Sequence, residues 1–131
     1  MAQPITVTDG ICFAFPDVCL TPAPPGPPVP IPYPNIAQLA DATGTASTVN
    51  AGGKPVVTEA SSIASSSGDE AGSNGGVTSG TTKGECKFTT FSATVRANGK
   101  AIVRLGDTTT QNGGNAVGTV LGGLPNVLVG G

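Results

Sequence analysis

The side chains able to perform nucleophilic or metal chemistry are few: Cys12, Cys19, Cys86 and eight carboxylates, with no histidine in 131 residues. A chain without histidine lacks the usual general base near neutral pH, the Cys-His and Ser-His nucleophile pairs, and every zinc site that uses imidazole. Three thiolates, with water or a carboxylate as a further ligand, could still bind zinc or another metal. The sequence therefore leaves two interpretations open: free thiols in a core, or a metal site formed by Cys12, Cys19 and Cys86.

The carboxylates do not form an evident catalytic pair. Asp69 and its neighbour Glu70 lie in a stretch rich in glycine and serine, which predicts a solvated turn. Asp17, beside Pro16, and Asp107 are predicted to cap turns by accepting hydrogen bonds from nearby backbone N–H groups. We therefore predict no catalytic residues and a protein that is not an enzyme.

Composition predicts one compact, loop-rich, all-β domain over residues 1–131. Hydrophobic residues make up 37% of the chain, and 20 glycines and 12 prolines interrupt any long helix. Charged residues are only 11%, well below the content typical of disordered chains. The net charge of −2, without a basic patch, gives nucleic-acid binding no electrostatic support.

The sequence offers no obvious targeting segment. No apolar run approaches the length of a membrane span, and residues 1–6 lack the basic start and apolar stretch of a signal peptide. We expect synthesis in the cytoplasm and export by a route that does not read a cleaved signal.

Nine of the 12 prolines lie between Pro16 and Pro34. Proline fixes φ and donates no backbone hydrogen bond, so this segment predicts an extended polyproline strap over residues 16–34 and excludes a helix or a central strand. Val29, Ile31 and Tyr33 within it need a surface to pack on. A stiff strap loses little conformational entropy when it is held in place, which suits a rigid protein.

An internal repeat relates residues 49–57 to residues 95–103 by a shift of 46 positions. In both copies a β-branched run meets a Gly-Gly-Lys or Asn-Gly-Lys turn and leaves as another β-branched run, the pattern of a β-hairpin. We predict equivalent hairpins at about 46–59 and 92–105, with a weaker third relative at residues 5–13. Repeated hairpins indicate pseudo-symmetric packing about an axis.

Several motifs together resemble a known family. They are Ile-Cys-Phe-Ala-Phe-Pro-Asp-Val-Cys at residues 11–19, Val-Pro-Ile-Pro-Tyr-Pro-Asn at 29–35, Ser-Gly-Asp-Glu-Ala-Gly at 67–72, Val-Arg-Leu-Gly-Asp at 103–107, and the apolar ending at 121–129. This combination resembles the PAAR-like domain, over residues 10–130. The resemblance implies a small conical fold of β-hairpins, broad at its base and sharp at its apex.

The resemblance also implies a function. Proteins of this kind form the structural tip of a type VI secretion or other contractile injection spike, where one tip caps a trimeric VgrG-like β-helix. They help to pierce the target membrane and recruit effectors, here without covalent fusion. The implied localisation is synthesis in the bacterial cytoplasm followed by delivery on the spike. The founding family binds zinc near the apex through histidines and a cysteine; this chain lacks those histidines and the Pro-Ala-Ala-Arg tetrad.

Two apolar groups are candidates for contact with the spike, although each is equally compatible with a place in the core. They are the strap residues Val29, Ile31 and Tyr33, and the tail residues Leu121, Leu124, Val127 and Leu128. Two alternative functions stay open at this point: a small secreted toxin enzyme, and a surface β-protein that needs no contractile machine.

Overall fold

The computed structural model describes residues 3–129 and is built from strands. Within that range the one helical element is a short 3-10 turn, η1 (Leu39–Asp41), and no helix there has the length and hydropathy that a membrane span requires. The all-β class predicted from the sequence is confirmed. The strands are β1 (Gln3–Ile5), β2 (Ile11–Thr21), β3 (Val29–Gln38), β4 (Ala42–Thr43), β5 (Asn50–Ala51), β6 (Lys54–Pro55), β7 (Ser62–Ile63), β8 (Cys86–Phe88), β9 (Arg96–Ala97), β10 (Lys100–Ala101), β11 (Thr108–Gln111), β12 (Ala116–Val120) and β13 (Leu124–Val129).

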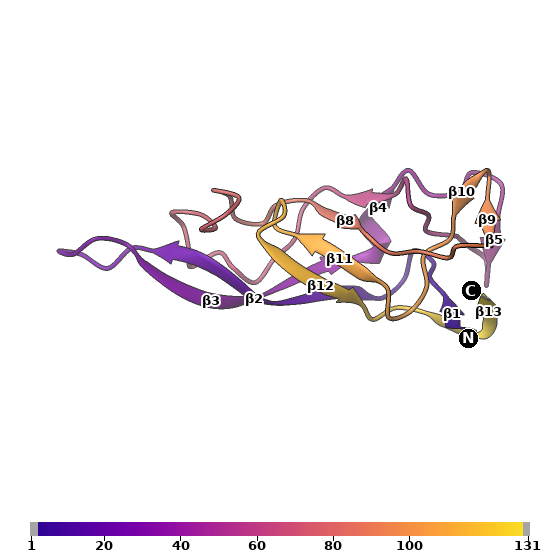
Figure 1. Cartoon of the computed structure of the whole chain (residues 1–131), viewed down its shortest axis with the longest axis horizontal. Helices are drawn as coiled ribbons and strands as arrows, with labels where there is room; N and C mark the ends of the chain where they lie inside the picture. The colour runs from indigo at the N-terminus through magenta and orange to yellow at the C-terminus, as the bar shows by residue number, and fades with distance from the viewer. Residues whose placement is uncertain (1–2, 130–131) are drawn as a thin grey trace.

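The molecule is elongated, with different structures at its two ends (Figure 1). A seven-stranded antiparallel sheet in the order β3-β2-β12-β11-β8-β7-β4 runs through the body. The long β2–β3 hairpin projects from this sheet and forms one end, which we call the apex (Figure 1). β1, β13 and the short hairpins β5–β6 and β9–β10 gather at the opposite end, which we call the base (Figure 1).

The sequence predicted a separate polyproline strap over residues 16–34. The structure instead makes this proline-rich segment part of the β2–β3 hairpin. Residues 16–21 belong to β2, residues 22–28 form the tip of the hairpin, and residues 29–34 are paired with β2 as part of β3. β3 is the edge strand of the sheet, so its prolines remove no hydrogen bond from a further neighbour. Edge placement therefore reconciles a row of prolines with a β-strand.

The two predicted hairpins at residues 46–59 and 92–105 are confirmed as β5–β6 and β9–β10. Their turns use the expected positive φ at Gly52, Gly53, Asn98 and Gly99. The predicted third hairpin within residues 5–13 is wrong, because Ile5 pairs with Leu124 and Ile11 pairs with Gln38. The third two-stranded unit of the base is β1–β13, which joins the two ends of the described chain.

Three backbone segments close a ring at the base with pseudo-threefold symmetry. Thr6 N–H donates to Val103 O (3.1 Å), Val103 N–H donates to Val57 O (3.0 Å), and Val57 N–H donates to Thr6 O (3.0 Å). All three residues are fully buried. Three further hydrogen bonds join the same segments with the opposite direction of donation: Thr8 N–H donates to Pro55 O, Glu59 N–H donates to Ala101 O, and Leu105 N–H donates to Pro4 O. The sequence repeat of two hairpins is thus completed to three by the chain's own first and last strands.

Apolar side chains form two clusters along the molecule. The first fills the body and contains Leu39, Ile63, Phe88 and Val120 with the thiols of Cys12 and Cys86. The second fills the base and contains Ile5, Val7, Ala46, Val56, Ala97, Ile102 and Val129. The ring adjoins the first cluster as well, because the side chains of Val57 and Val103 belong to it. The apolar core thus extends through the body and base, whereas buried polar side chains fill the interior beneath the apical hairpin.

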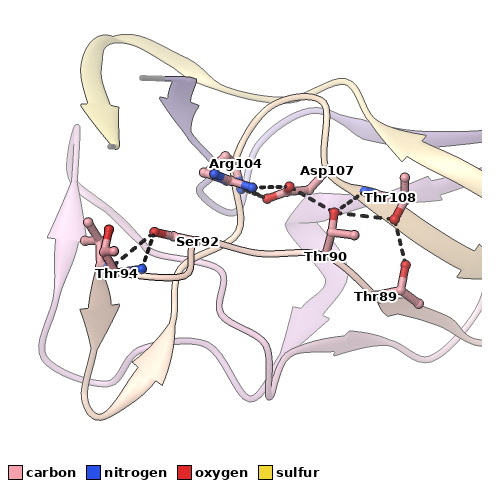
Figure 2. A network of polar contacts seen from close by, with 8 residues as sticks. Thr89, Thr90, Ser92, Thr94, Arg104, Asp107 and Thr108 are labelled. Carbon is pink, nitrogen blue, oxygen red and sulfur yellow. Dashed lines mark hydrogen bonds and ion pairs between the residues drawn. The ribbon is translucent and has the colours of Figure 1, made fainter. Parts of the chain in front are cut away.

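A charged contact joins the base to the sheet (Figure 2). Asp107 accepts two hydrogen bonds from the Arg104 guanidinium, at 3.1 and 2.8 Å, and one from the Arg104 backbone N–H at 2.7 Å. The Thr90 hydroxyl donates to the same carboxylate (2.9 Å) and accepts from the Thr108 N–H (2.8 Å). The predicted turn-capping role of Asp107 is confirmed, and the contact also fixes the direction in which the chain enters β11.

Replacing Val103 by alanine is expected to lower the free energy of unfolding by about 2 kcal/mol, because two buried methyl groups leave the apolar cluster of the body. Denaturant unfolding measures this. The matched control is Val117→Ala, whose side chain is 70% exposed and whose loss should cost less than about 0.5 kcal/mol. Equal effects at the two positions would contradict the placement of Val103 in the buried core.

Asp107→Asn is expected to cost about 3 kcal/mol, because it leaves the mostly buried Arg104 guanidinium without its counter-charge. The control is Glu85→Gln, which removes an exposed ion pair with Lys87 and should change stability by less than about 1 kcal/mol. Both values come from the same unfolding measurement, and an Asp107 variant as stable as the control would refute the argument.

Candidate functional site

Two regions carry the features expected of a functional protein: a buried polar cluster beneath the apical hairpin, and the three-sided base. The cluster contains Asp17 and Cys19 from β2 and Asp69 from the loop at residues 65–84. All three side chains are fully buried, and one possible ligand atom from each lies within 4.8 Å of the other two. No other described group of three Cys, Asp or Glu residues comes together in this way.

A β-bulge in β2 brings Asp17 and Cys19 to the inside. Cys12 and Ala14 point inward in the first half of the strand, and the register with β3 then shifts between Ala14 and Asp17. Since side chains alternate along a strand, one extra residue moves the inward positions from even to odd numbers. Asp17 and Cys19, two residues apart, therefore share the buried face.

The loop at residues 65–84 covers this face by pairing with β2 at one edge of the hairpin and with β3 at the other. Leu20 N–H donates to Gly75 O (2.8 Å) and Val77 N–H donates to Val18 O (3.0 Å). Further along, Ser67 and Ile36 exchange two backbone hydrogen bonds of 2.8 Å. These contacts carry Asp69 under the hairpin.

The loop packs closely against Cys19. A Cβ atom at Gly72 would overlap the Cβ of Cys19 and lie 3.0 Å from the Tyr33 ring, so only glycine fits at this position.

Amide groups hold one oxygen of Asp17 and leave the other free. Oδ1 accepts hydrogen bonds from the side-chain amides of Asn112 (3.1 Å) and Asn115 (2.5 Å), and the Cys19 thiol lies 3.6 Å from it. Oδ2 is buried and has no hydrogen-bond partner among the described residues. Flipping either side-chain amide would break a hydrogen bond, since the Asn112 oxygen accepts from Gly84 N–H (2.9 Å) and the Asn115 oxygen accepts from Thr78 N–H (2.8 Å).

Asp69 is held by the backbone and by Asn35. Its two oxygens lie 3.0 and 3.3 Å from the Lys83 N–H, and the Asn35 amide donates to Oδ2 at 3.3 Å. Asn35 is fixed in turn by Gln111, whose amide donates to Asn35 Oδ1 at 2.9 Å. A polar network therefore replaces an apolar core in this part of the molecule.

The environment strongly disfavours negative charge at the cluster. Burial, and after it the neighbouring Asp17 carboxyl, raises the pKa of Asp69 to about 7. Burial, followed by the charges of Asp17 and Asp69, raises the pKa of the Cys19 thiol to about 12. Two carboxyl groups and a thiol in a dry site favour a bound proton or cation that offsets their charge. The group could hold a metal ion.

The structure separates the three cysteines predicted as a possible metal site. Cys19 belongs to the polar cluster, whereas Cys12 and Cys86 lie in the apolar core of the body. Contact with the Cys86 thiol, and then burial, raises the pKa of Cys12 far above its usual range, so this thiol stays protonated.

Two of the carboxylates differ from their predicted roles. Asp69 is not part of a solvated turn, because it is buried, while the adjacent Glu70 is exposed and bonds to Gly68 N–H (2.8 Å). Asp17 does not cap a turn, because its described hydrogen bonds come from side-chain amides and a thiol. The spacing Asp-Val-Cys on a strand was the available signal, since it places both polar groups on one face.

The two groups predicted to contact a spike lie at opposite ends of the molecule, so one flat surface cannot contain both. Val29, Ile31 and Tyr33 belong to the apical hairpin, where Tyr33 Oη bonds to Thr21 Oγ1 (2.7 Å) (Figure 1). Leu124 and Val127 pack against the core of the base, and Leu128 beside them is 60% exposed. Leu121 lies between the two ends, where its N–H donates to Ile11 O (2.9 Å).

Gly72→Ala is expected to lower the free energy of unfolding by about 1–3 kcal/mol, because the added methyl group must displace Cys19 or Tyr33. Gly26→Ala at the hairpin tip is the control, since its added Cβ would meet nothing closer than Ala23 O at 3.5 Å. Thermal and denaturant unfolding compare the two. A stable Gly72 variant would show that the loop does not pack on Cys19 as described.

Comparison with known proteins places these features in a family. The sequence profile described as "Toxin PAAR-like domain" matches residues 10–118, which include the apical hairpin, the polar cluster and two of the three base units. No curated protein and no solved structure matches the chain significantly.

Proposed function

Because the chain belongs to the Toxin PAAR-like domain family, we propose that it is the structural tip of a bacterial secretion spike. Its base caps a trimeric VgrG-like β-helix, and its apical hairpin is the leading end. One observation carries the assignment of the base: the closed ring of hydrogen bonds through Thr6, Val57 and Val103 makes a single chain pseudo-threefold at that end. A monomer on the axis of a trimer must offer three similar edges, and this base does so.

An exposed apolar side chain at the base is compatible with the same orientation. The exposed Leu128 lies on β13. Leu124, on the same strand, packs against the turn of β5–β6, where a Cβ added to Gly52 would contact its side chain. The docking surface therefore comprises the tail residues Leu124, Val127 and Leu128 with the turns of β5–β6 and β9–β10. The strap residues Val29, Ile31 and Tyr33 are excluded from it and belong to the apex.

A structural role fits the chemistry of the chain better than catalysis, despite the word toxin in the family description. The titratable groups that come together, Asp17, Cys19 and Asp69, are fully buried, where no substrate can reach them. The edge prolines of β3 and the loop packed against β2 stiffen the apical hairpin, as piercing a membrane requires. The protein is made in the cytoplasm, leaves the cell on the spike, and carries effectors.

Mixing the pure protein with its cognate spike trimer is expected to give a complex of one chain per trimer, measured by native mass spectrometry. Leu128→Glu places a charge in the docking surface and should weaken binding at least tenfold, or by about 1.4 kcal/mol. Val29→Glu, at a comparably exposed apical position, is the matched control and should bind as the unchanged protein does. Any other stoichiometry, or loss of binding in the apical variant alone, would refute the proposed orientation.

A further inference from the structure

The buried cluster beneath the apical hairpin contains acidic groups that form no ion pair with a described lysine or arginine. Asp17 and Asp69 come within 4.8 Å of each other and of Cys19, and none of the three has solvent contact. The ion pairs formed by the described lysines and arginines involve Glu59, Glu85 and Asp107, and none reaches this cluster. Two carboxylates in a dry interior are costly unless a cation or proton lies between them.

The hydrogen bonds around Asp17 match those of a carboxylate that binds a metal through one oxygen. Two asparagine amides are directed at Oδ1, and their reversal is prevented by backbone donors on their own oxygens. Oδ2, fully buried, is left with an unused lone pair. In metal sites the ligating carboxylate is commonly oriented by such outer hydrogen bonds while its other oxygen binds the ion.

The remaining groups complete a compatible donor set. The Cys19 sulfur has only long contacts, 3.6 Å to Asp17 Oδ1 and 3.7 Å to the Asn112 amide, so deprotonation would break no strong bond. The Asp69 oxygens accept bonds of 3.0–3.3 Å and retain lone pairs. A thiolate with two carboxylates favours zinc over magnesium or calcium, which prefer oxygen ligands alone.

We propose that Asp17, Cys19 and Asp69 form a histidine-free site for one zinc ion, with Oδ2 of Asp17 and Sγ of Cys19 as ligands beside the Asp69 carboxylate. The residues fit the ion because the site supplies an orphaned buried oxygen, a thiol and a second carboxylate from two chain segments. Binding releases the thiol proton. The ion joins β2 to the loop at residues 65–84, so its binding free energy stabilises the fold of the apex. This proposal does not depend on spike docking.

The test uses the full chain, stripped of metal and titrated with Zn²⁺ in a calorimeter and with Co²⁺ in a spectrophotometer. One equivalent of each is expected per chain, and Co²⁺ should give the thiolate-to-metal charge-transfer band. A hundredfold excess of Zn²⁺ over its dissociation constant should raise Tm by roughly 10 °C. The neutral isostere Asp17→Asn and the variant Cys19→Ser should each bind Zn²⁺ at least about a hundredfold more weakly.

Cys12→Ala is the matched control, because its thiol is equally buried but lies in the apolar core. It should keep the charge-transfer band and the Zn²⁺ affinity even where its own stability falls, so a folding defect and a binding defect can be told apart. A band that persists in Cys19→Ser would overturn the proposal by placing the metal elsewhere. Absence of Zn²⁺ binding and of any Zn²⁺-dependent rise in Tm would overturn it as well, and would leave a proton shared by Asp17 and Asp69 as the counter-charge.

Discussion

Three backbone segments from distant parts of the chain donate hydrogen bonds to one another in a closed circuit through Thr6, Val57 and Val103. Each segment is buried, so its N–H and C=O groups depend on the other two for partners. Removing any one segment would leave unsatisfied donors and acceptors on both remaining segments, which is costly in an apolar interior. The base is therefore cooperative, although the hairpins in it are only two residues long on each strand.

The rest of the molecule is organised by its distance from this ring. The apolar cluster of the base and that of the body, to which Val57 and Val103 belong, both adjoin it. Beyond the body lies the apical hairpin, under which asparagines, a glutamine and carboxyl groups replace apolar side chains. A narrow end cannot bury enough apolar surface to be stabilised by the hydrophobic effect alone. Directional hydrogen bonds, and the zinc ion that we propose, supply rigidity where packing volume is small.

This arrangement also relates the proposed spike-tip function to physical properties. A protein that caps a trimer needs three-sidedness only at the surface where it docks, and the pseudo-threefold ring lies at the base. A protein that leads a spike needs a stiff end and no exposed reactive groups. Here the cysteine thiols are buried. Edge prolines both stiffen β3 and discourage further strands from pairing with it, because they present no N–H groups.

The sequence by itself determined the all-β class, the two repeated hairpins, the turn cap at Asp107 and the family, because each depends on local signals such as an Asn-Gly turn or a short motif. Only the tertiary structure decided the third base unit, since β1 and β13 are at opposite ends of the chain and share no repeat with the hairpins. It alone also brought Asp69 to Asp17 and Cys19, because a one-residue bulge reverses which side chains of β2 face inward and the loop then closes over them. Long-range pairing and register depend on the whole fold, and no local pattern of residues specifies them.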